Sequence, residues 1–261
     1  MALLSVQGVT VRFGGLVAND AISFAVEPGT VFAVIGPNGA GKTTLFNVIS
    51  GALAPSAGSV EFAGEAVTGL PQHRIAERGL VRTYQLVQLF KELTVAENVR
   101  AGFHRVTRGG IAAALVRPGW ARAQEAEVAR KTSELLAFVG LDGQGDVLAD
   151  TLPYGRQRLL EVARALAAEP KLLLLDEPAA GLNTQETEAL AGVIERVNGR
   201  GVTVLLVEHD MSLVMRVAKR IVVIDFGRKI AEGAPAEIRA HPDVLAAYLG
   251  GTETESSTAD A

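Results

Sequence analysis

GPNGAGKT, at residues 36–43, matches the phosphate-binding pattern G-x-x-x-x-G-K-[ST]. The apolar run at 31–35 predicts a buried strand before it, and residues 44–50 predict a helix after it. Glycines let successive backbone N–H groups surround a phosphate, and the helix N-terminus adds a favourable dipole. The segment therefore predicts binding of a nucleoside triphosphate, through Gly36, Pro37, Asn38, Gly39, Ala40, Gly41, Lys42, Thr43 and Thr44.

Lys42 and Thr43 carry the chemistry of this loop. The Lys42 ammonium brings a positive charge to the outer phosphates, and the Thr43 hydroxyl can be a ligand of Mg²⁺. The alternative is a glycine turn that precedes a Lys-Thr pair by chance. The strand and the helix predicted on either side of the loop make that alternative the weaker one.

Composition limits the architecture and the class of function. The chain has 261 residues, 48% of them hydrophobic, which suits one domain with an inserted lobe. We expect a soluble chain, because no apolar run approaches the ~18 residues that cross a bilayer and no charged-then-apolar leader opens the sequence. The absence of cysteine excludes disulfides and thiolate metal sites and fits a cytosolic protein. The net charge of −4 argues against a nucleic-acid partner.

Strand patterns at both ends of the chain predict an α/β core. Residues 4–9 and 21–26 alternate in polarity, and 59–64 resemble half of a hairpin. Continuous apolar runs at 172–175 and 202–207 are typical of parallel strands that are covered on both faces.

Between these strands the pattern is mostly helical from Pro71 onward. Thr94-Val95-Ala96-Glu97 matches a capping box at the start of a helix. A later amphipathic segment ends near residue 140, and we expect the apolar residues of one helical face to pack in the core. These residues are Trp120, Val128, Leu135 and Val139. The predicted fold is an α/β P-loop NTPase core with a mixed sheet and flanking helices (about 1–85 and 166–250), an inserted helical subdomain (about 86–165) and a disordered acidic tail (251–261).

Two carboxylates follow the apolar run at 172–175. Asp176 suits a magnesium ion held against the phosphates, and Glu177 suits a base that orients an attacking water. A helix N-cap or a solvated strand end is the alternative, which a nearby phosphate loop disfavours. His209 follows the next apolar run and can donate to a γ-phosphate, although an exposed or hydrogen-bonded histidine at a strand end is the commoner explanation of such a residue.

These motifs, in this order, resemble the nucleotide-binding domain of ATP-binding cassette (ABC) transporters. The deciding match is LPYGRQR at residues 152–158, which is similar to the family's LSGGQ signature loop. The resemblance runs from about residue 3 to residue 250. It implies an ABC-type fold, ATP and Mg²⁺ as ligands, and ATP hydrolysis that requires two such domains.

The resemblance also implies roles for single residues. Phe13 is similar to the aromatic residue that stacks on adenine, although it could be a core residue at a strand end. Gln85 is similar to the glutamine that touches Mg²⁺ and reports the nucleotide state to the membrane partner. Glu177 and His209 match the catalytic glutamate and the switch histidine. Contacts with the nucleotide of the opposing subunit are implied for Tyr154 and Gly155. Asn183, also implied to bind nucleotide, matches the dimer-contacting loop, where the family more usually has Asp.

Pro153 departs from the family pattern, because it replaces the signature serine. Proline lacks the hydroxyl and the backbone N–H, although it suits the first turn of a helix. In this family the signature loop of one chain closes over the phosphate loop of the other. The deficit is therefore expected at the partner's nucleotide.

Shorter motifs are similar to one of the two ATPase subunits of branched-chain amino-acid importers. They include EHDM at 208–211, AYLG at 247–250 and a longer lobe around residues 109–121. This implies a peripheral subunit on the cytoplasmic face of the membrane, with transmembrane permeases, a second ATPase or a second copy, and indirectly an external binding protein. Other readings stay open: a urea or amide importer, a lipopolysaccharide exporter, a soluble ABC ATPase and a small-molecule phosphotransferase.

Overall fold

The computed structural model describes residues 1–105 and 119–249. Its larger sheet has the order β10-β9-β3-β8-β7-β6, in which all pairs are parallel except β9 with β10. Parallel pairing places the carboxyl ends of its strands along one edge. The strands are β3 (Val31–Ile35), β6 (Leu80–Arg82), β7 (Leu172–Asp176), β8 (Thr203–Val207), β9 (Arg220–Asp225) and β10 (Arg228–Gly233).

A second, antiparallel sheet has the order β2-β1-β4-β5. Register shifts interrupt the pairing of β1 with β2, so the long hairpin that they form is irregular. The hairpin predicted at 59–64 is confirmed by β4 and β5. The strands are β1 (Leu4–Phe13), β2 (Leu16–Val26), β4 (Ala57–Phe62) and β5 (Glu65–Ala66).

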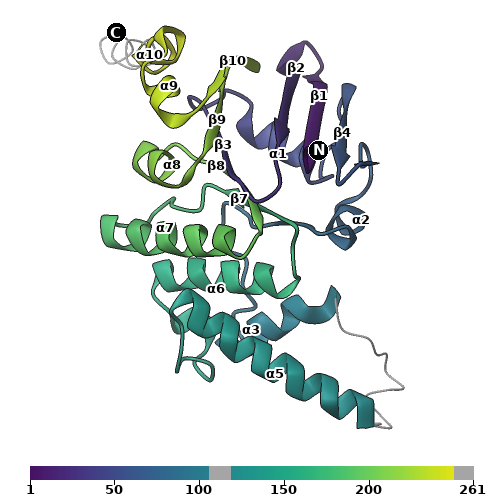
Figure 1. Ribbon diagram of the computed structural model, residues 1–261, viewed down its shortest axis with the longest axis vertical. Helices are drawn as coiled ribbons and strands as arrows, with labels where there is room; N and C mark the ends of the chain where they lie inside the picture. Colours follow the sequence, from purple (N-terminus) through teal and green to yellow (C-terminus); the bar gives the residue numbers. More distant parts are fainter. Residues whose placement is uncertain (106–118, 250–261) are drawn as a thin grey trace, which may run out of the picture.

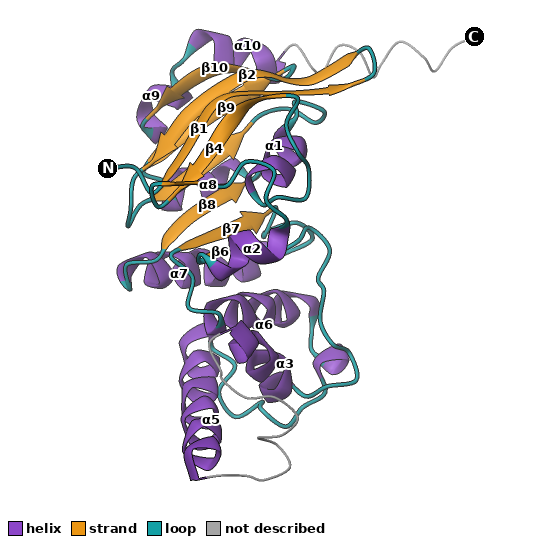
Figure 2. Cartoon of the chain, turned by 90° about the vertical axis from the view of Figure 1, so that its right-hand side faces the viewer, coloured by secondary structure: helices purple, strands orange, loops and turns teal. Residues whose placement is uncertain are grey.

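Helices cover the larger sheet and extend beyond it (Figures 1 and 2). In both views α3, α5 and α6 lie together at the end of the molecule away from the sheets, and α7 lies between them and the strands. The helices are α1 (Lys42–Ile49), α2 (Gln72–Glu77), α3 (Val95–Gly102), α5 (Gly119–Val139), α6 (Tyr154–Ala167), α7 (Thr184–Gly199), α8 (Met211–Val217), α9 (Pro235–Arg239) and α10 (Pro242–Leu249), with short 3₁₀ turns at Phe103–Arg105 and Ala149–Thr151.

The apolar runs of the parallel strands are buried on both faces, as predicted. Every residue of β3, β7 and β8 is buried, and consecutive side chains enter different hydrophobic clusters. Leu173 and Leu175 pack in the cluster on the side of α6 and α7, whereas Leu172 and Leu174 pack toward α1 and the second sheet. This two-sided burial explains why the strands lack polar alternation.

The helical signals between the two halves of the core are largely confirmed. Thr94 and Glu97 form a complete capping box at the start of α3. Val139 is buried near the end of α5, as the core-packing interpretation requires. The helical pattern from Pro71 was wrong at residues 80–82, which form β6, because pairing with β7 outweighs local preference there. The limits of the predicted lobe (86–165) stay a prediction.

Two features of the sequence lie outside the described residues: most of the segment at 109–121, and all of the tail predicted at 251–261. Across residues 1–105 and 119–249, none of the helices is both long enough and apolar enough to cross a membrane.

Truncation of Leu205 to alanine should lower the free energy of unfolding by about 3 kcal/mol, because it opens a cavity in a close-packed core. Leu205 is fully buried in β8 and packs between the two sheets. Denaturant-induced unfolding measures the change. The matched control is Leu245→Ala on α10, where the side chain is 48% exposed and the cost should be about 0.5 kcal/mol or less. Equal losses in the two variants would contradict this account of the core.

Candidate functional site

The phosphate loop connects β3 to α1, and two of its glycines could not be replaced by a larger residue without movement of their surroundings. Gly41 has a φ of 97°, and a Cβ there would lie 2.3 Å from the carbonyl oxygen of Ala18. A Cβ at Gly36 would lie 2.0 Å from the carbonyl oxygen of Ile224. The loop is therefore wedged between β2 and β9, which fixes the path of its backbone.

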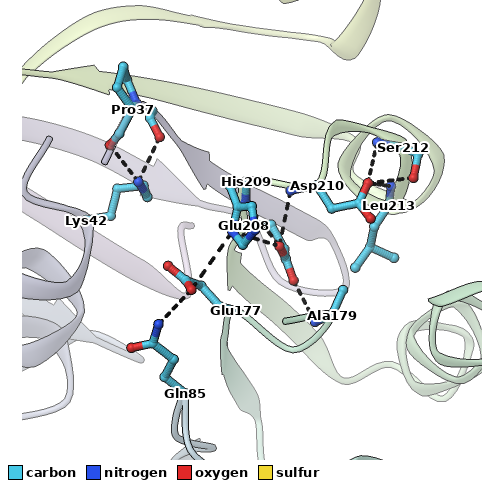
Figure 3. A network of polar contacts seen from close by, with 11 residues as sticks. Pro37, Lys42, Gln85, Glu177, Ala179, Glu208, His209, Asp210, Ser212 and Leu213 are labelled. Carbon is cyan, nitrogen blue, oxygen red and sulfur yellow. Dashed lines mark hydrogen bonds and ion pairs between the residues drawn. The ribbon is translucent and has the colours of Figure 1, made fainter. Parts of the chain in front are cut away.

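Lys42 is buried inside this loop. Its Nζ donates hydrogen bonds to the carbonyl oxygens of Gly36 (2.7 Å) and Pro37 (2.8 Å), as Figure 3 shows for the network around it. Burial lowers the pKa of Lys42, and the negative charge of Glu177 opposes that shift. The ammonium is thus close to the acidic end of the site, where a phosphate can replace its carbonyl partners.

A cleft of 520 Å³ opens beside the loop. Its lining joins residues 38–44 to Glu177 and to the turns of two hairpins, which contribute Phe13 and Phe226. Phe13 is 51% exposed, so it is not a core residue at the end of a strand. The cleft thus has apolar side chains at one end and phosphate-binding and acidic groups at the other.

Glu177, Gln85 and His209 come together at the carboxyl edge of the sheet. Gln85 Nε2 donates to Glu177 Oε2 at 2.8 Å, and His209 Nδ1 lies 3.9 Å from the same oxygen (Figure 3). Glu177 also has a φ of 45°, a left-handed value that is rare for residues with a side chain. The Glu177 backbone N–H donates a hydrogen bond to the Val207 carbonyl oxygen at 2.9 Å. This strained backbone turns the carboxylate toward the cleft.

Glu208 organises the loops around this cluster, a role that the sequence analysis missed. Its carboxylate is fully buried and accepts hydrogen bonds from the backbone N–H groups of Ala179 (2.7 Å) and His209 (3.0 Å). Burial raises the pKa of Glu208, and these backbone donors oppose the shift. Glu208 therefore ties the segment after Glu177 to the segment that carries His209. Its position, directly after a buried strand, was the only signal in the sequence.

Asp176 is buried beside the cleft but does not line it. Its Oδ2 accepts a hydrogen bond from Arg82 Nη2 at 2.6 Å, and both side chains are almost inaccessible to solvent. The sequence analysis placed Asp176 at a metal site and gave Arg82 no role. The structure shows that the guanidinium of Arg82 lies at the acidic end of β7.

Arg158 on α6 is a second buried arginine that the sequence analysis left without a role. It donates to the carbonyl oxygens of Tyr84 (3.1 Å) and Gln85 (2.5 Å) and lies 3.6 Å from Glu161. The helix that follows the signature motif is thereby fastened to the backbone that carries Gln85.

The signature residues lie on a different surface from the phosphate loop. Pro153 is the N-cap of α6, with a φ of −54°, as expected for proline at a helix start. A Cβ at Gly155 would lie 2.5 Å from Glu186, and one at Gly181 would lie 3.2 Å from the Tyr154 ring. Among the described residues that line the 520 Å³ cleft, none comes from this surface.

Asn183 belongs to this second surface and also has a structural role. Its side chain accepts from the Glu186 N–H at 3.0 Å, and the Glu186 carboxylate accepts from the Asn183 N–H, also at 3.0 Å. The pair is a capping box for α7. The pattern Asn-x-x-Glu was readable in the sequence and was overlooked.

Comparison with known proteins identifies the family. The ABC transporter family profile matches residues 19–180, and a profile described as a branched-chain amino acid ATP-binding cassette transporter matches 228–254. The chain is 46% identical to the branched-chain amino acid transport ATP-binding protein BraF of Pseudomonas aeruginosa, over 95% of this chain and 98% of that one. It is 43% identical to LivG of Escherichia coli K12, with the same coverage.

Solved structures agree with the fold. An ATP-binding cassette of an ABC transporter, MJ1267 in its ADP conformation, has a TM-score of 0.83 and 32% identity over 96% of this chain and 99% of that one. A nucleotide-free ATP-binding cassette from an ABC transporter has a TM-score of 0.82 and 31% sequence identity. The match covers 95% of this chain and 99% of that one. The predicted fold class and the resemblance to ABC ATPases are confirmed. The chain therefore belongs to the ATP-binding subunits of ABC transporters, a family in which ATP hydrolysis powers transport.

Proposed function

We propose that this chain binds and hydrolyses ATP to power a membrane importer of branched-chain amino acids. The convergence of Gln85 and His209 on Glu177, beside an intact phosphate loop, carries the hydrolytic part of the proposal. The near full-length likeness to BraF and LivG supports the substrate class. The same likeness favours this function over urea or amide import, lipopolysaccharide export, a soluble ABC ATPase or a phosphotransferase.

The cleft suits ATP along its whole length. Phe13 is placed to stack on the adenine, since its exposed ring lies at the apolar end. The backbone of residues 36–41 and the Lys42 ammonium bind the phosphates, and the N-terminus of α1 adds its dipole. Phosphate oxygens then replace the two carbonyl oxygens that Lys42 contacts.

The residues beside the phosphates fit a magnesium ion. Thr43 supplies an exposed hydroxyl that lines the cleft, and Asp176 and Gln85 supply further oxygen atoms, the donors that Mg²⁺ prefers. When bound, the ion neutralises charge on the outer phosphates. Among the described residues no group of three or more acidic, His or Cys side chains is arranged to hold a metal ion, and phosphate oxygens of the nucleotide would complete the set of donors.

Hydrolysis requires a positioned water, and Glu177 is the residue that would accept its proton. His209 supports the water from the other side and donates to the γ-phosphate, while Gln85 holds the Glu177 carboxylate in place. Because Glu177 is only 15% exposed, its charge acts in a partly desolvated site, where it is stronger than in water.

The separate surface that carries Tyr154, Gly155 and Asn183 acts on the nucleotide of a second ATPase, which is a related subunit or another copy. Closure of two chains around ATP would place each signature surface over the partner's phosphate loop. Release after hydrolysis then converts a difference in affinity between two states into movement of the helical lobes.

A groove of 750 Å³ beside Gln85 is the surface we assign to the permease. It lies between the segment 81–90 and helices α3 and α6, with Leu86 and Phe90 exposed along it. Arg158 fastens the same segment to α6. Movement of the predicted lobe (86–165) would therefore reach the permease through this groove, at the cytoplasmic face of the membrane.

Uptake assays test the transport function. Deletion of the gene should abolish uptake of labelled leucine, isoleucine and valine, and the wild-type chain, unlike a Glu177→Gln chain, should restore it. Labelled urea serves as the control substrate and should be unaffected. Loss of urea uptake with normal amino-acid uptake would overturn the assigned substrate class.

Replacement of Glu177 by glutamine should lower ATP hydrolysis in the assembled complex by about 100-fold or more, because a carboxamide cannot accept the proton of the water. Binding of ATP should persist, since the phosphate loop is unchanged. Phosphate release and fluorescent-nucleotide binding measure the two effects. The control is Glu195→Gln, which alters a solvent-exposed ion pair between α7 and Arg216 on α8 and should leave hydrolysis unchanged.

Replacement of Pro153 by serine should raise turnover only in the assembled complex, because the added hydroxyl would reach the partner's γ-phosphate. Binding of ATP to the isolated chain should stay the same. Pro153→Ala is the matched control, since it restores the backbone N–H without the hydroxyl. Equal turnover of all three complexes would show that position 153 has no direct contact with phosphate.

A further inference from the structure

Arg82 lies at the end of β6, three residues before Gln85, and is bonded on two sides. One terminal nitrogen, Nη2, donates to Asp176 Oδ2 at 2.6 Å. The other, Nη1, donates to Asn47 Oδ1 and Ser50 Oγ, both at 2.8 Å, at the C-terminal end of α1. The guanidinium therefore bridges the acidic end of β7 and the helix that follows the phosphate loop.

Aromatic rings fix the same guanidinium in position. Its central carbon lies 5.9 Å from the centroid of the Phe46 ring and 5.2 Å from that of Tyr84. Only 6% of the Arg82 side chain and 3% of the Asp176 side chain are exposed. Solvent and salt therefore screen this pair weakly, and its charges act strongly on any ion that approaches Asp176.

The position of the pair matters because Asp176 is also the carboxylate expected to face a metal. An oxygen that accepts a 2.6 Å hydrogen bond from a guanidinium is a poorer donor to a second cation. Arg82 also carries a positive charge that repels a divalent ion at the same carboxylate. Both effects weaken the binding of a metal ion at Asp176. If Arg82 only stabilised the fold, its replacement would leave the affinity for the metal ion unchanged.

We propose that Arg82 is a positioning residue that holds Asp176 when no metal is bound and thereby limits the affinity of the site for Mg²⁺. The proposal rests on the magnesium site described under the proposed function. It explains why a charged side chain is buried at this point, next to the nucleotide site and not within it.

The test compares the affinity of the full chain for a fluorescent ADP analogue in excess Mg²⁺ and in EDTA. The ratio of the two dissociation constants reports the contribution of the metal. In Arg82→Met the ratio should increase about tenfold, because the competing cation is gone. Arg82→Lys keeps the charge and should stay close to the wild-type ratio.

Two further variants separate this effect from a loss of structure. Removing one partner of a buried pair destabilises proteins, so Arg82→Gln is made as a second neutral variant that can still bond to Asn47 and Ser50. Its ratio should also rise. In Arg164→Met a half-buried arginine that stacks on the Phe90 ring is lost, and the ratio should stay at the wild-type value. Circular dichroism and thermal unfolding confirm that each variant is folded.

The outcomes are distinct. A ratio that is unchanged or lower in both neutral variants, while the wild-type chain responds to Mg²⁺, would overturn the role of Arg82 alone. A wild-type chain whose ADP affinity is the same in Mg²⁺ and in EDTA would overturn the magnesium site and this inference together.

Discussion

The site depends on the parallel pairing of β3, β8, β7 and β6. Asp176 pairs in register with Val207, and Arg82 with Leu174, so neighbouring strands end at nearly the same level. Because the strands run in the same direction, the phosphate loop and the segments that carry Glu177, His209 and Gln85 all leave the sheet along one edge. The two-sided apolar burial of these strands fixes that edge, and the Glu208 and Arg158 hydrogen bonds then fix the loops that leave it.

This arrangement buries charged side chains, and hydrogen bonds within the chain compensate for their lost hydration. Glu208 accepts hydrogen bonds from backbone N–H groups, Lys42 donates hydrogen bonds to backbone carbonyl oxygens, and Arg82 forms an ion pair with Asp176. Each of these bonds also fixes a loop in position. Under the proposed function, ATP would enter a site whose charges already have partners, and Lys42 would exchange its two carbonyl partners for phosphate oxygens.

The two functional surfaces of the chain are separated by the same architecture. The phosphate loop follows a strand of the sheet, whereas the signature motif begins α6, which packs with α3 and α5 away from the strands (Figure 2). The Arg158 hydrogen bonds to the backbone of Tyr84 and Gln85 connect helix α6 directly to the segment whose Gln85 side chain contacts Glu177. Such a division suits a protein whose catalytic unit is shared between two chains, as we propose.

The sequence by itself determined the phosphate loop, the acidic end of β7, the α/β core and the family, because these depend on local spacing and on apolar runs. Only the tertiary structure decided how the charges are paired. The partners of Arg82, Glu208 and Arg158 are distant in the chain, and no local pattern specifies such contacts. It also decided that Phe13 faces the cleft, since the side on which an irregular hairpin presents a residue depends on register shifts that alternation does not encode.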